Sequence, residues 1–394
     1  MYRKKHYASL LKLFALVLLT GLLVACGSTS TTQNAEATGT TTPDKPTETS
    51  STPAQTKTSP TANSSQTTTH DPLTSIRMVD KLNGWALSKQ GILKTTDGGQ
   101  HWQSVTPSNI TAHYTGARGA FLDNQNAWVA TVQQQNGTIT ILHTTDGGQH
   151  WQNSQIQQQG IESIDMPHFV NANTGWLEVM GSPGAGSQGV YIYHTTDGSQ
   201  WELLGKSGEN GINNGGFKSG ISPLNAETFF ATTRSTTGNP TDPGLYVSHD
   251  GAQSWQQQHL NPPHGNENVQ QMGTTPPVFF GNDGFLPVYI TNNDGKTFLN
   301  LYRSENGGAD WMAQSNVEMN ASTVFVLDKN HAWASDQQTG KLYYTANGGA
   351  SWQAAEQAPG AFEEMSFVDA SNGWAITKSA LLHTTDGGKT WQEL

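Results

Sequence analysis

The stretch Thr95-Thr96-Asp97-Gly98-Gly99-Gln100-His101-Trp102 decides the fold, because it recurs along the chain. Further copies occupy residues 144–151, 195–201, 248–255, 304–311, 345–352 and 384–391, and every copy ends in Trp. The third position of the seven copies holds Asp97, Asp146, Asp197, Asp250, Asn306, Asn347 and Asp386. Seven copies in order indicate a repeat architecture rather than chance similarity.

A second signature precedes most copies: two apolar residues, then Asp or Asn, four variable residues and Trp. It is seen first as Met78-Val79-Asp80 with Trp85, and it recurs at residues 121–128, 169–176, 326–333 and 367–374. The fourth repeat has Phe230 after Asn225, and the fifth has Phe285 without an acid upstream. Together the two signatures account for all 12 tryptophans.

Each repeat contains four short β-rich stretches separated by turn residues, with no helical periodicity of useful length. Four strands per repeat, seven times, predict an all-β, seven-bladed β-propeller of four-stranded blades over residues 73–394. The first repeat begins with its inner strand and the last ends with its outer strand. We therefore expect the ring to close by packing of the end blades, without a strand exchanged between the termini.

The repeated turn resembles the Asp box of bacterial neuraminidase repeats. Asp or Asn in such a turn accepts hydrogen bonds from nearby backbone N–H groups, and glycine tolerates positive φ. A calcium loop or a catalytic carboxylate is the alternative. Seven near-identical copies disfavour it, because an active site needs one special blade, and Asn306 and Asn347 would weaken a metal site. We interpret the turns as structural and expect no metal, cofactor or catalytic residue among them.

The amino terminus predicts export and anchoring. Residues 1–25 carry a basic start and a short apolar run, which is typical of a signal peptide rather than a membrane span. The tetrad Leu23-Val24-Ala25-Cys26 resembles a bacterial lipobox, in which the cysteine is acylated; an ordinary signal peptide with an incidental cysteine is the alternative. Two or more acyl chains anchor stably. We expect Cys26 to hold the protein at the outer face of a bacterial cell membrane.

Residues 26–72 form a segment of different composition. Between Gly27 and Pro72, 23 of 46 residues are Ser or Thr, and Ala is the only apolar side chain. Such a segment buries too little apolar surface to offset chain entropy, so a disordered tether is expected. The net charge is −11 overall and −15 beyond residue 25, because four basic residues and no acid precede it. Phosphate binding needs a basic surface, so this negative net charge argues against a nucleic-acid partner.

The two signatures together resemble the photosystem II stability and assembly factor family of propellers. The units that carry the likeness include Asn372-Gly373-Trp374-Ala375 followed by residues 383–388, and the resemblance covers residues 75–394. It implies a seven-bladed ring that binds partner proteins during assembly and has no catalytic activity.

Loop lengths place variation on one face. The turns that contain the third-position Asp or Asn agree closely, whereas the loops of the opposite face are long and unlike one another, at residues 133–137, 181–189, 205–220, 234–244 and 259–277. Loops on a rigid scaffold often carry recognition, so the loops of repeats two to five are expected to bind a protein or, as the other possibility, a glycan. The alternative is that these loops are solvated insertions without function. A monomer is expected.

The runner-up interpretation is a glycosidase, which cuts with a pair of carboxylates. Acids outside the repeat template are Glu162, Asp165, Glu178, Glu227, Glu363 and Glu364. A sialidase is disfavoured because its arginine triad needs three converging guanidinium groups, and only Arg77, Arg118, Arg234 and Arg303 lie in the folded part. The sequence contains no His-Glu-x-x-His, Gly-x-Ser-x-Gly or phosphate-loop motif.

Overall fold

The computed structural model describes residues 72–110, 112–234, 244–263, 268–355 and 360–394. The chain divides into two units, Met1–Gln66 and Thr67–Leu394, of which the first lies outside the described residues. The predicted signal peptide, Cys26 and nearly all of the predicted tether therefore also lie outside them. Every regular element in the described part is a β-strand, and no helix there is long and apolar enough to cross a membrane.

The first three blades follow one another along the chain. Blade 1 contains β1 (Leu73–Met78), β2 (Gly84–Ser88), β3 (Gly91–Thr95) and β4 (Gln103–Ser104). Blade 2 contains β5 (Arg118–Phe121), β6 (Ala127–Gln133), β7 (Thr138–Thr144) and β8 (Gln152–Gln157). Blade 3 contains β9 (Ile161–Ile164), β10 (His168–Phe169), β11 (Gly175–Gly181), β12 (Val190–Thr195) and β13 (Glu202–Lys206).

The remaining four blades complete the ring. Blade 4 contains β14 (Phe217–Pro223), β15 (Phe229–Arg234), β16 (Leu245–Ser248) and β17 (Gln256–Gln258). Blade 5 contains β18 (Val269–Thr274), β19 (Val278–Phe280), β20 (Asp283–Asn292), β21 (Thr297–Ser304) and β22 (Asn316–Glu318). Blade 6 contains β23 (Ala321–Val326), β24 (Ala332–Asp336), β25 (Leu342–Thr345) and β26 (Gln353–Ala354), and blade 7 contains β27 (Glu364–Phe367), β28 (Gly373–Ile376), β29 (Leu381–Thr384) and β30 (Gln392–Glu393).

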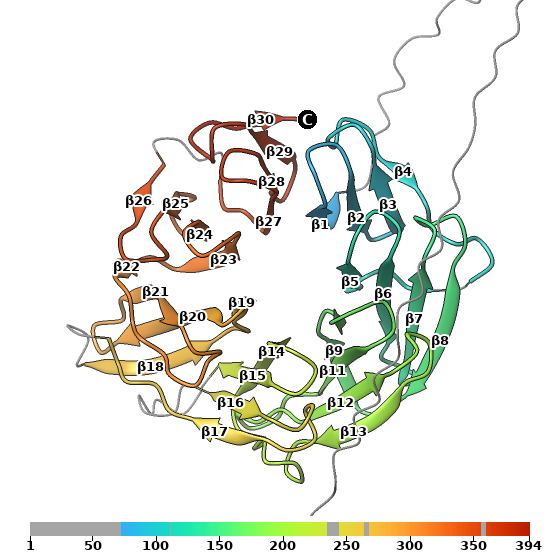
Figure 1. Cartoon of the computed structure of the whole chain (residues 1–394), viewed down its shortest axis with the longest axis horizontal. Helices are drawn as coiled ribbons and strands as arrows, with labels where there is room; N and C mark the ends of the chain where they lie inside the picture. The colour runs from blue at the N-terminus through green and yellow to red at the C-terminus, as the bar shows by residue number, and fades with distance from the viewer. Residues whose placement is uncertain (1–71, 111, 235–243, 264–267, 356–359) are drawn as a thin grey trace, which may run out of the picture. The chain divides into compact units, whose positions relative to one another are not determined.

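The described part is a seven-bladed β-propeller, as predicted (Figure 1). Every blade is an antiparallel sheet whose strands run outward in chain order from an inner strand at the channel. Blades 4 and 5 are joined into one nine-stranded sheet, because Arg234 of β15 pairs with Gly273 of β18. In blades 3 and 5 the inner strand is broken in two, at residues 165–167 and 275–277, where Pro167, Pro276 and Pro277 cannot donate to a ladder.

One predicted loop is wrong in part. Residues 259–277 were expected to be irregular throughout, yet they contain β18, which pairs with the second half of β20. β20 is ten residues long, so its backbone groups beyond β19 need a further partner strand. Likewise the 205–220 crossing is shorter than predicted, because β13 reaches Lys206 and β14 begins at Phe217.

The core lies in the seams between blades, where the second-signature tryptophans are buried. Trp85, Trp128, Trp176, Trp333 and Trp374 are at most 2% exposed. Phe230 and Phe285 take the same position in blades 4 and 5, since they pair with Val247 and Arg303 as Trp85 pairs with Lys94. These rings fill the space between neighbouring sheets, which is how a short four-stranded blade acquires a core.

The ring closes between blade 7 and blade 1 without an exchanged strand, as expected. Met78 donates its backbone N–H to Ser366 Oγ at 2.9 Å, and Trp374 Nε1 donates to the Gly98 carbonyl at 2.8 Å. Lys81 forms an ion pair with Asp369 at 3.0 Å. Ile76, Met78, Trp374 and Ile376 belong to one apolar cluster at this seam. Side-chain packing thus replaces the strand exchange that would otherwise join the ends.

Candidate functional site

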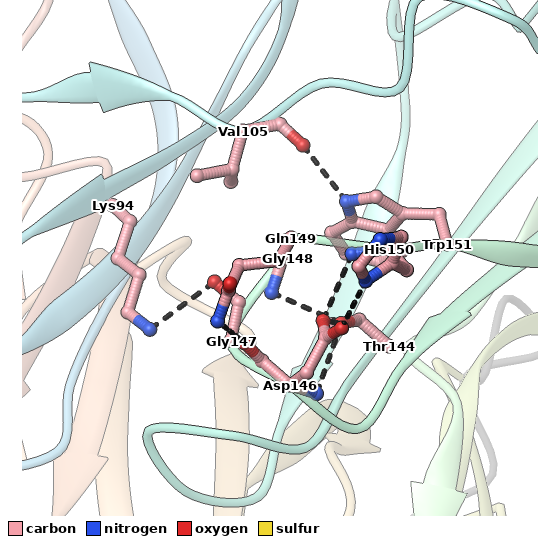
Figure 2. A network of polar contacts seen from close by, with 9 residues as sticks. All are labelled: Lys94, Val105, Thr144, Asp146, Gly147, Gly148, Gln149, His150 and Trp151. Atoms are coloured by element: carbon pink, nitrogen blue, oxygen red, sulfur yellow. Dashed lines mark hydrogen bonds and ion pairs between the residues drawn. The ribbon is translucent and has the colours of Figure 1, made fainter.

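The turn at Asp146 shows what the repeated motif does locally (Figure 2). Asp146 Oδ1 accepts hydrogen bonds from His150 N at 2.9 Å and from the Thr144 hydroxyl at 2.9 Å. Thr144 Oγ1 in turn accepts from Gly148 N at 3.0 Å, and Gly148 has a φ of 89°, a conformation that glycine adopts readily. The side chains therefore satisfy backbone donors that the tight turn leaves unpaired.

The other six copies repeat this pattern. Oδ1 of the Asp or Asn accepts from a backbone N–H two to four residues later, and also from the preceding Thr or Ser hydroxyl. Asn306 and Asn347 make the same Oδ1 contacts as the aspartates, at 3.0 and 2.9 Å to Asp310 N and Ser351 N. Among the described residues no three His, Cys, Asp or Glu side chains are grouped as metal ligands.

The hydrogen bonds also control the charge of the turn. The pKa of Asp146 is lowered to about 2, first by the backbone N–H of His150 and then by the imidazole of the same residue. The pKa of Asp197 is also lowered to about 2, through the backbone N–H groups of Gln200 and Ser199. Both carboxylates are therefore ionised at neutral pH and serve as strong acceptors.

His143, His194 and His383 occupy one repeated position, directly before the Thr-Thr of the repeated turn. Each pairs across the sheet with a core tryptophan, Trp128, Trp176 and Trp374 respectively. His143 stacks on Trp128 with ring centroids 4.2 Å apart, and His383 lies 4.5 Å from Trp374. Burial lowers the pKa of all three histidines, which favours the neutral ring. These contacts identify the histidines as parts of the seams.

The most elaborate loops of the opposite face meet at blades 3 and 4. The hairpin between β11 and β12 and the crossing from β13 to β14 are held together by Gln188, whose N–H donates to the Asn214 carbonyl at 2.7 Å. The Gln188 side chain donates to the Gly181 carbonyl at 3.0 Å and accepts from Lys218 N at 2.9 Å. Gly216 N also donates to the Gly186 carbonyl at 3.0 Å. The two loops therefore form one braced block.

A cleft of about 560 Å³ lies between the hairpin and the crossing. Its lining residues are polar or small, and they include Ser182, Ser187, Tyr191, Lys206, Glu209 and Asn214. Lys206 and Glu209 form an ion pair at 2.8 Å, and Ser207 Oγ donates to Asn214 Oδ1 at 2.6 Å. The cleft is open to solvent, and its side chains are held in place by one another. It suits a polar backbone or hydroxyl-rich ligand more than an apolar one.

The sequence indicated this face but not these residues. Gln188, Tyr191 and Asn214 occupy positions that the repeat template leaves variable, so nothing in the pattern marks them. Their roles depend on contacts across a crossing between blades. Of the five predicted loops, 234–244 lies almost entirely outside the described residues, and part of 259–277 does as well.

The untemplated carboxylates do not gather at one place. Glu227 lies in the turn between β14 and β15, on the face of the Asp146-type turns, as its carbonyl accepts from Gly251 N. Glu162 and Glu363 are exposed. Glu364 lines the central channel, where it accepts from Ser75 Oγ at 3.0 Å and Ile76 N at 3.3 Å. Burial raises the pKa of Glu364 to about 7, against the effect of these hydrogen bonds.

Asp165 and Glu178 are the two that interact. Glu178 is 1% exposed, and burial followed by the charge of Asp165 raises its pKa well above the usual value, with Lys218 opposing. Asp165 Oδ2 accepts from Ile221 N of blade 4 at 3.1 Å and lies 3.3 Å from His168 Nε2. This pair links blade 3 to blade 4 within the wall of the ring.

The sequence matches no described protein family and no curated protein. Solved structures match the fold. YCF48 from Cyanidioschyzon merolae is 17% identical with a TM-score of 0.53, over 81% of this chain and 96% of that one. A structure of YCF48 bound to D1 peptide is 20% identical with a TM-score of 0.52, over 80% and 92%.

A glycoside hydrolase also matches. The GH74 xyloglucanase from Xanthomonas campestris is 12% identical with a TM-score of 0.55, over 81% of this chain and 52% of that one. Identities this low show the fold alone, and one fold hosts many activities. The chain therefore shares its β-propeller fold with YCF48 and with a xyloglucanase.

Proposed function

We propose that this protein is a non-enzymatic binding module, anchored to the outer face of a bacterial cell membrane through Cys26, that holds a protein partner on the loop face of blades two to five. The observation that carries the proposal is the braced cleft between residues 181–189 and 206–214. A pre-organised loop block loses little conformational entropy on binding, so more of the contact energy appears as affinity.

The chemistry of the cleft favours a peptide as ligand. Serine hydroxyls, the Tyr191 ring and the Lys206–Glu209 ion pair offer donors, acceptors and both charges within one concave surface. An extended peptide presents the complementary N–H, C=O and side-chain groups. The YCF48 structure bound to D1 peptide supports this class of partner for the fold. A glycan is the alternative ligand, because its hydroxyl groups would satisfy the same polar atoms.

Absence of catalysis is part of the proposal. A glycosidase needs two accessible carboxyl groups facing one substrate, about 5–9.5 Å apart. Glu178 is shielded from solvent, and Glu364 is already engaged by Ser75 and Ile76. These positions support a structural role for both. Hydrolysis of a panel of fluorogenic glycosides by the wild-type protein, lost in Glu364→Gln or Asp165→Asn, would contradict the proposal.

The cleft is tested by capture of membrane proteins with the immobilised full chain. Tyr191→Ala and the charge reversal Glu209→Lys should each reduce capture of a reproducible partner at least fivefold. Tyr343→Ala on blade 6 is the matched control, because it removes a half-buried strand tyrosine far along the ring. Equal loss in the control, or unchanged capture in both cleft variants, would exclude this cleft as the binding site.

The anchor is tested separately. Cys26→Ser should abolish labelling by a clickable fatty acid and release the protein from the membrane fraction, because the only cysteine of the chain is lost. Mass spectrometry of the mature wild-type protein should find a diacylated cysteine at its amino terminus. An unmodified Cys26 within a longer chain would contradict the lipobox interpretation.

A further inference from the structure

The central channel has a different character at its two ends. Its cavity of about 680 Å³ is lined by the inner strands of blades 1, 2, 3, 5, 6 and 7. Ser75 and Glu364 lie toward the loop face, near the start of their strands. At the other end the lining residue just before each turn is aliphatic, namely Val79, Leu122, Leu327 and Val368. We call this end the apolar mouth.

The channel cavity exposes several large apolar side chains. Nine large apolar side chains are exposed among the described residues, and three of them line this cavity: Leu122 at 47%, Met166 at 42% and Val278 at 37%. A fourth, Val170 at 39%, directly follows the lining residue Phe169. Single exposed apolar residues are ordinary, but a concave cluster of them marks an interaction surface. Met166 and Val278 lie farther along the channel wall, beside the breaks in the inner strands of blades 3 and 5.

Aspartates on the turn face form a partial ring beside the apolar mouth, with Asn171 and Asn225 in the equivalent inner turns of blades 3 and 4. Asp80, Asp123, Asp328 and Asp369 each follow an aliphatic lining residue, and the repeated turns on the same face add Asp97, Asp146, Asp197, Asp250 and Asp386. Three lysines lie within these turns, Lys81, Lys329 and Lys389, and Lys81 is ion-paired with Asp369 at 3.0 Å. Burial raises the pKa of the four inner aspartates, but their turn hydrogen bonds together lower it below the usual value. The ring therefore stays negative at neutral pH.

We propose that the apolar mouth binds a polypeptide segment whose apolar side chains are flanked by lysine or arginine. The apolar side chains would enter the mouth of the channel, and the flanking cations would face the aspartate ring. Such complementarity steers association and selects the partner. A second copy of this chain is a poor occupant, because it would bring the same negative ring. This surface lies opposite the cleft of blades 3 and 4 and is independent of it.

The test uses fluorescence polarisation with the full chain and a labelled peptide, Gly-Lys-Lys-Leu-Leu-Lys-Lys-Gly. The wild-type protein should bind it, and affinity should fall about tenfold or more when salt rises from about 50 to 300 mM, because the flanking charges are screened. Peptides with the leucines changed to serine, or the lysines to glutamate, should bind at least tenfold more weakly. Failure of the wild-type protein to bind the first peptide would overturn the proposal.

Variants separate charge from structure. Asp80→Asn, Asp123→Asn, Asp328→Asn and Asp369→Asn, combined, remove four charges while keeping the acceptor oxygen. Asn171 and Asn225 occupy the equivalent positions of blades 3 and 4 and accept the same turn N–H bonds, so the fold tolerates the change. This variant should bind the peptide at least tenfold more weakly, and its binding should depend less on salt than that of the wild-type protein. Unchanged affinity would overturn the proposal.

Apolar contact is tested by Leu122→Ser with Val278→Ser, which should weaken binding at least fivefold. The control is Leu203→Ser with Met312→Ser, since these residues are exposed but lie on outer parts of blades 3 and 5. Equal weakening in the control would contradict specific binding at the apolar mouth. Light scattering tests the other occupant: a wild-type dimer that Leu122→Ser dissociates would show that a second copy of the chain binds there, which would also contradict the proposal. Tyr191→Ala should not change the affinity for this peptide. The proposal for the apolar mouth and the proposal for the cleft of blades 3 and 4 are therefore tested independently.

Discussion

At the scale of single residues, the repeated turn needs one side-chain oxygen in one place. Asp146 and Asn347 both accept a backbone N–H four residues on and a hydroxyl two residues before. The acceptor oxygen, rather than the negative charge, is the shared requirement. That explains why the chain alternates between Asp and Asn at this position without changing the strands on either side.

Asp386→Ala should lower the free energy of unfolding by about 1 kcal/mol, because Thr390 N and the Thr384 hydroxyl lose their acceptor. Asp386→Asn should cost less, since Asn306 and Asn347 already serve in this position. Denaturant melts measure both. The wild-type midpoint should not depend on added chelator; a chelator effect that Asp386→Ala removes would identify the turn as a metal site instead.

At the scale of strands and blades, each seam is held by a polar contact above its apolar core. Trp128, Trp176, Trp333 and Trp374 donate their indole N–H to the first glycine carbonyl of the next blade's repeated turn, at 2.8 to 3.4 Å. Where a tryptophan is missing, another group takes over. Gln258 donates to the Gly308 carbonyl at 2.8 Å between blades 4 and 5, and Lys329 pairs with Asp283 between blades 5 and 6.

The first seam divides the task between two residues. Trp85 Nε1 donates to the Asp123 carbonyl at 2.9 Å, while Lys94 donates to the Gly147 carbonyl at 3.2 Å (Figure 2). Lys94 Nζ also lies 4.6 Å from the centre of the Trp85 ring. A cation over an aromatic face adds to the hydrogen bonds that the same ammonium group makes across the seam.

Trp374→Phe should lower stability by roughly 1–3 kcal/mol, because the Gly98 carbonyl is left without its donor at the closing seam. Trp102→Phe is the matched control. Trp102 belongs to the same apolar cluster, but its buried Nε1 makes no hydrogen bond among the described residues. The control should therefore lose clearly less free energy of unfolding, measured in a denaturant melt. Equal losses in the two variants would assign the effect to ring size rather than to the hydrogen bond.

Glu364 makes the same seam sensitive to pH. Its pKa is raised by burial from an ordinary 4.5 to about 7, so the folded state favours the protonated acid. The stabilisation is present below about pH 4.5 and is lost as the pH rises through about 7. The wild-type melting temperature should therefore fall between these values more steeply than that of Glu364→Gln. Glu363→Gln, which changes an exposed neighbour, should show the same dependence of melting temperature on pH as the wild type. If Glu364→Gln shows that same dependence, the raised pKa of Glu364 is contradicted.

At the scale of the propeller, closure gives every blade two neighbours. Blade 1 contacts blade 7 through β1 and β27 as well as blade 2 through the Trp85 seam. No blade in the described residues lacks a packed face. Loss of one seam exposes apolar surface on two sheets at once, which favours unfolding of the ring in a single transition.

Met78→Ala should lower the free energy of unfolding by about 2–5 kcal/mol, since Met78 is fully buried between blades 1 and 7. Circular dichroism and tryptophan fluorescence should report one coincident transition at a lower temperature. The exposed Met312→Ala variant should melt as the wild type does. Separate transitions for the two probes would show that the end blades unfold independently of the rest.

The sequence alone determined the architecture, because the repeats are local. Four strands, a hydrogen-bonded turn and a core aromatic residue recur within each unit, so the blade and the number of blades follow from spacing. Phe230 and Phe285 were placed correctly for the same reason, as one aromatic ring substitutes for another in a seam. The break in the fifth inner strand was missed, because β18 is required only by the length of β20, which the repeat pattern does not reveal.

Only the tertiary structure decided where a ligand can bind. Gln188 braces the loop block through atoms of residues 181, 214 and 218, and no periodicity marks such contacts. The apolar mouth depends likewise on six strands that converge from the whole length of the chain. Leu122 looks like an ordinary core position in the repeat pattern. Its exposure arises because the inner strands of a closed ring face a channel rather than a neighbouring sheet.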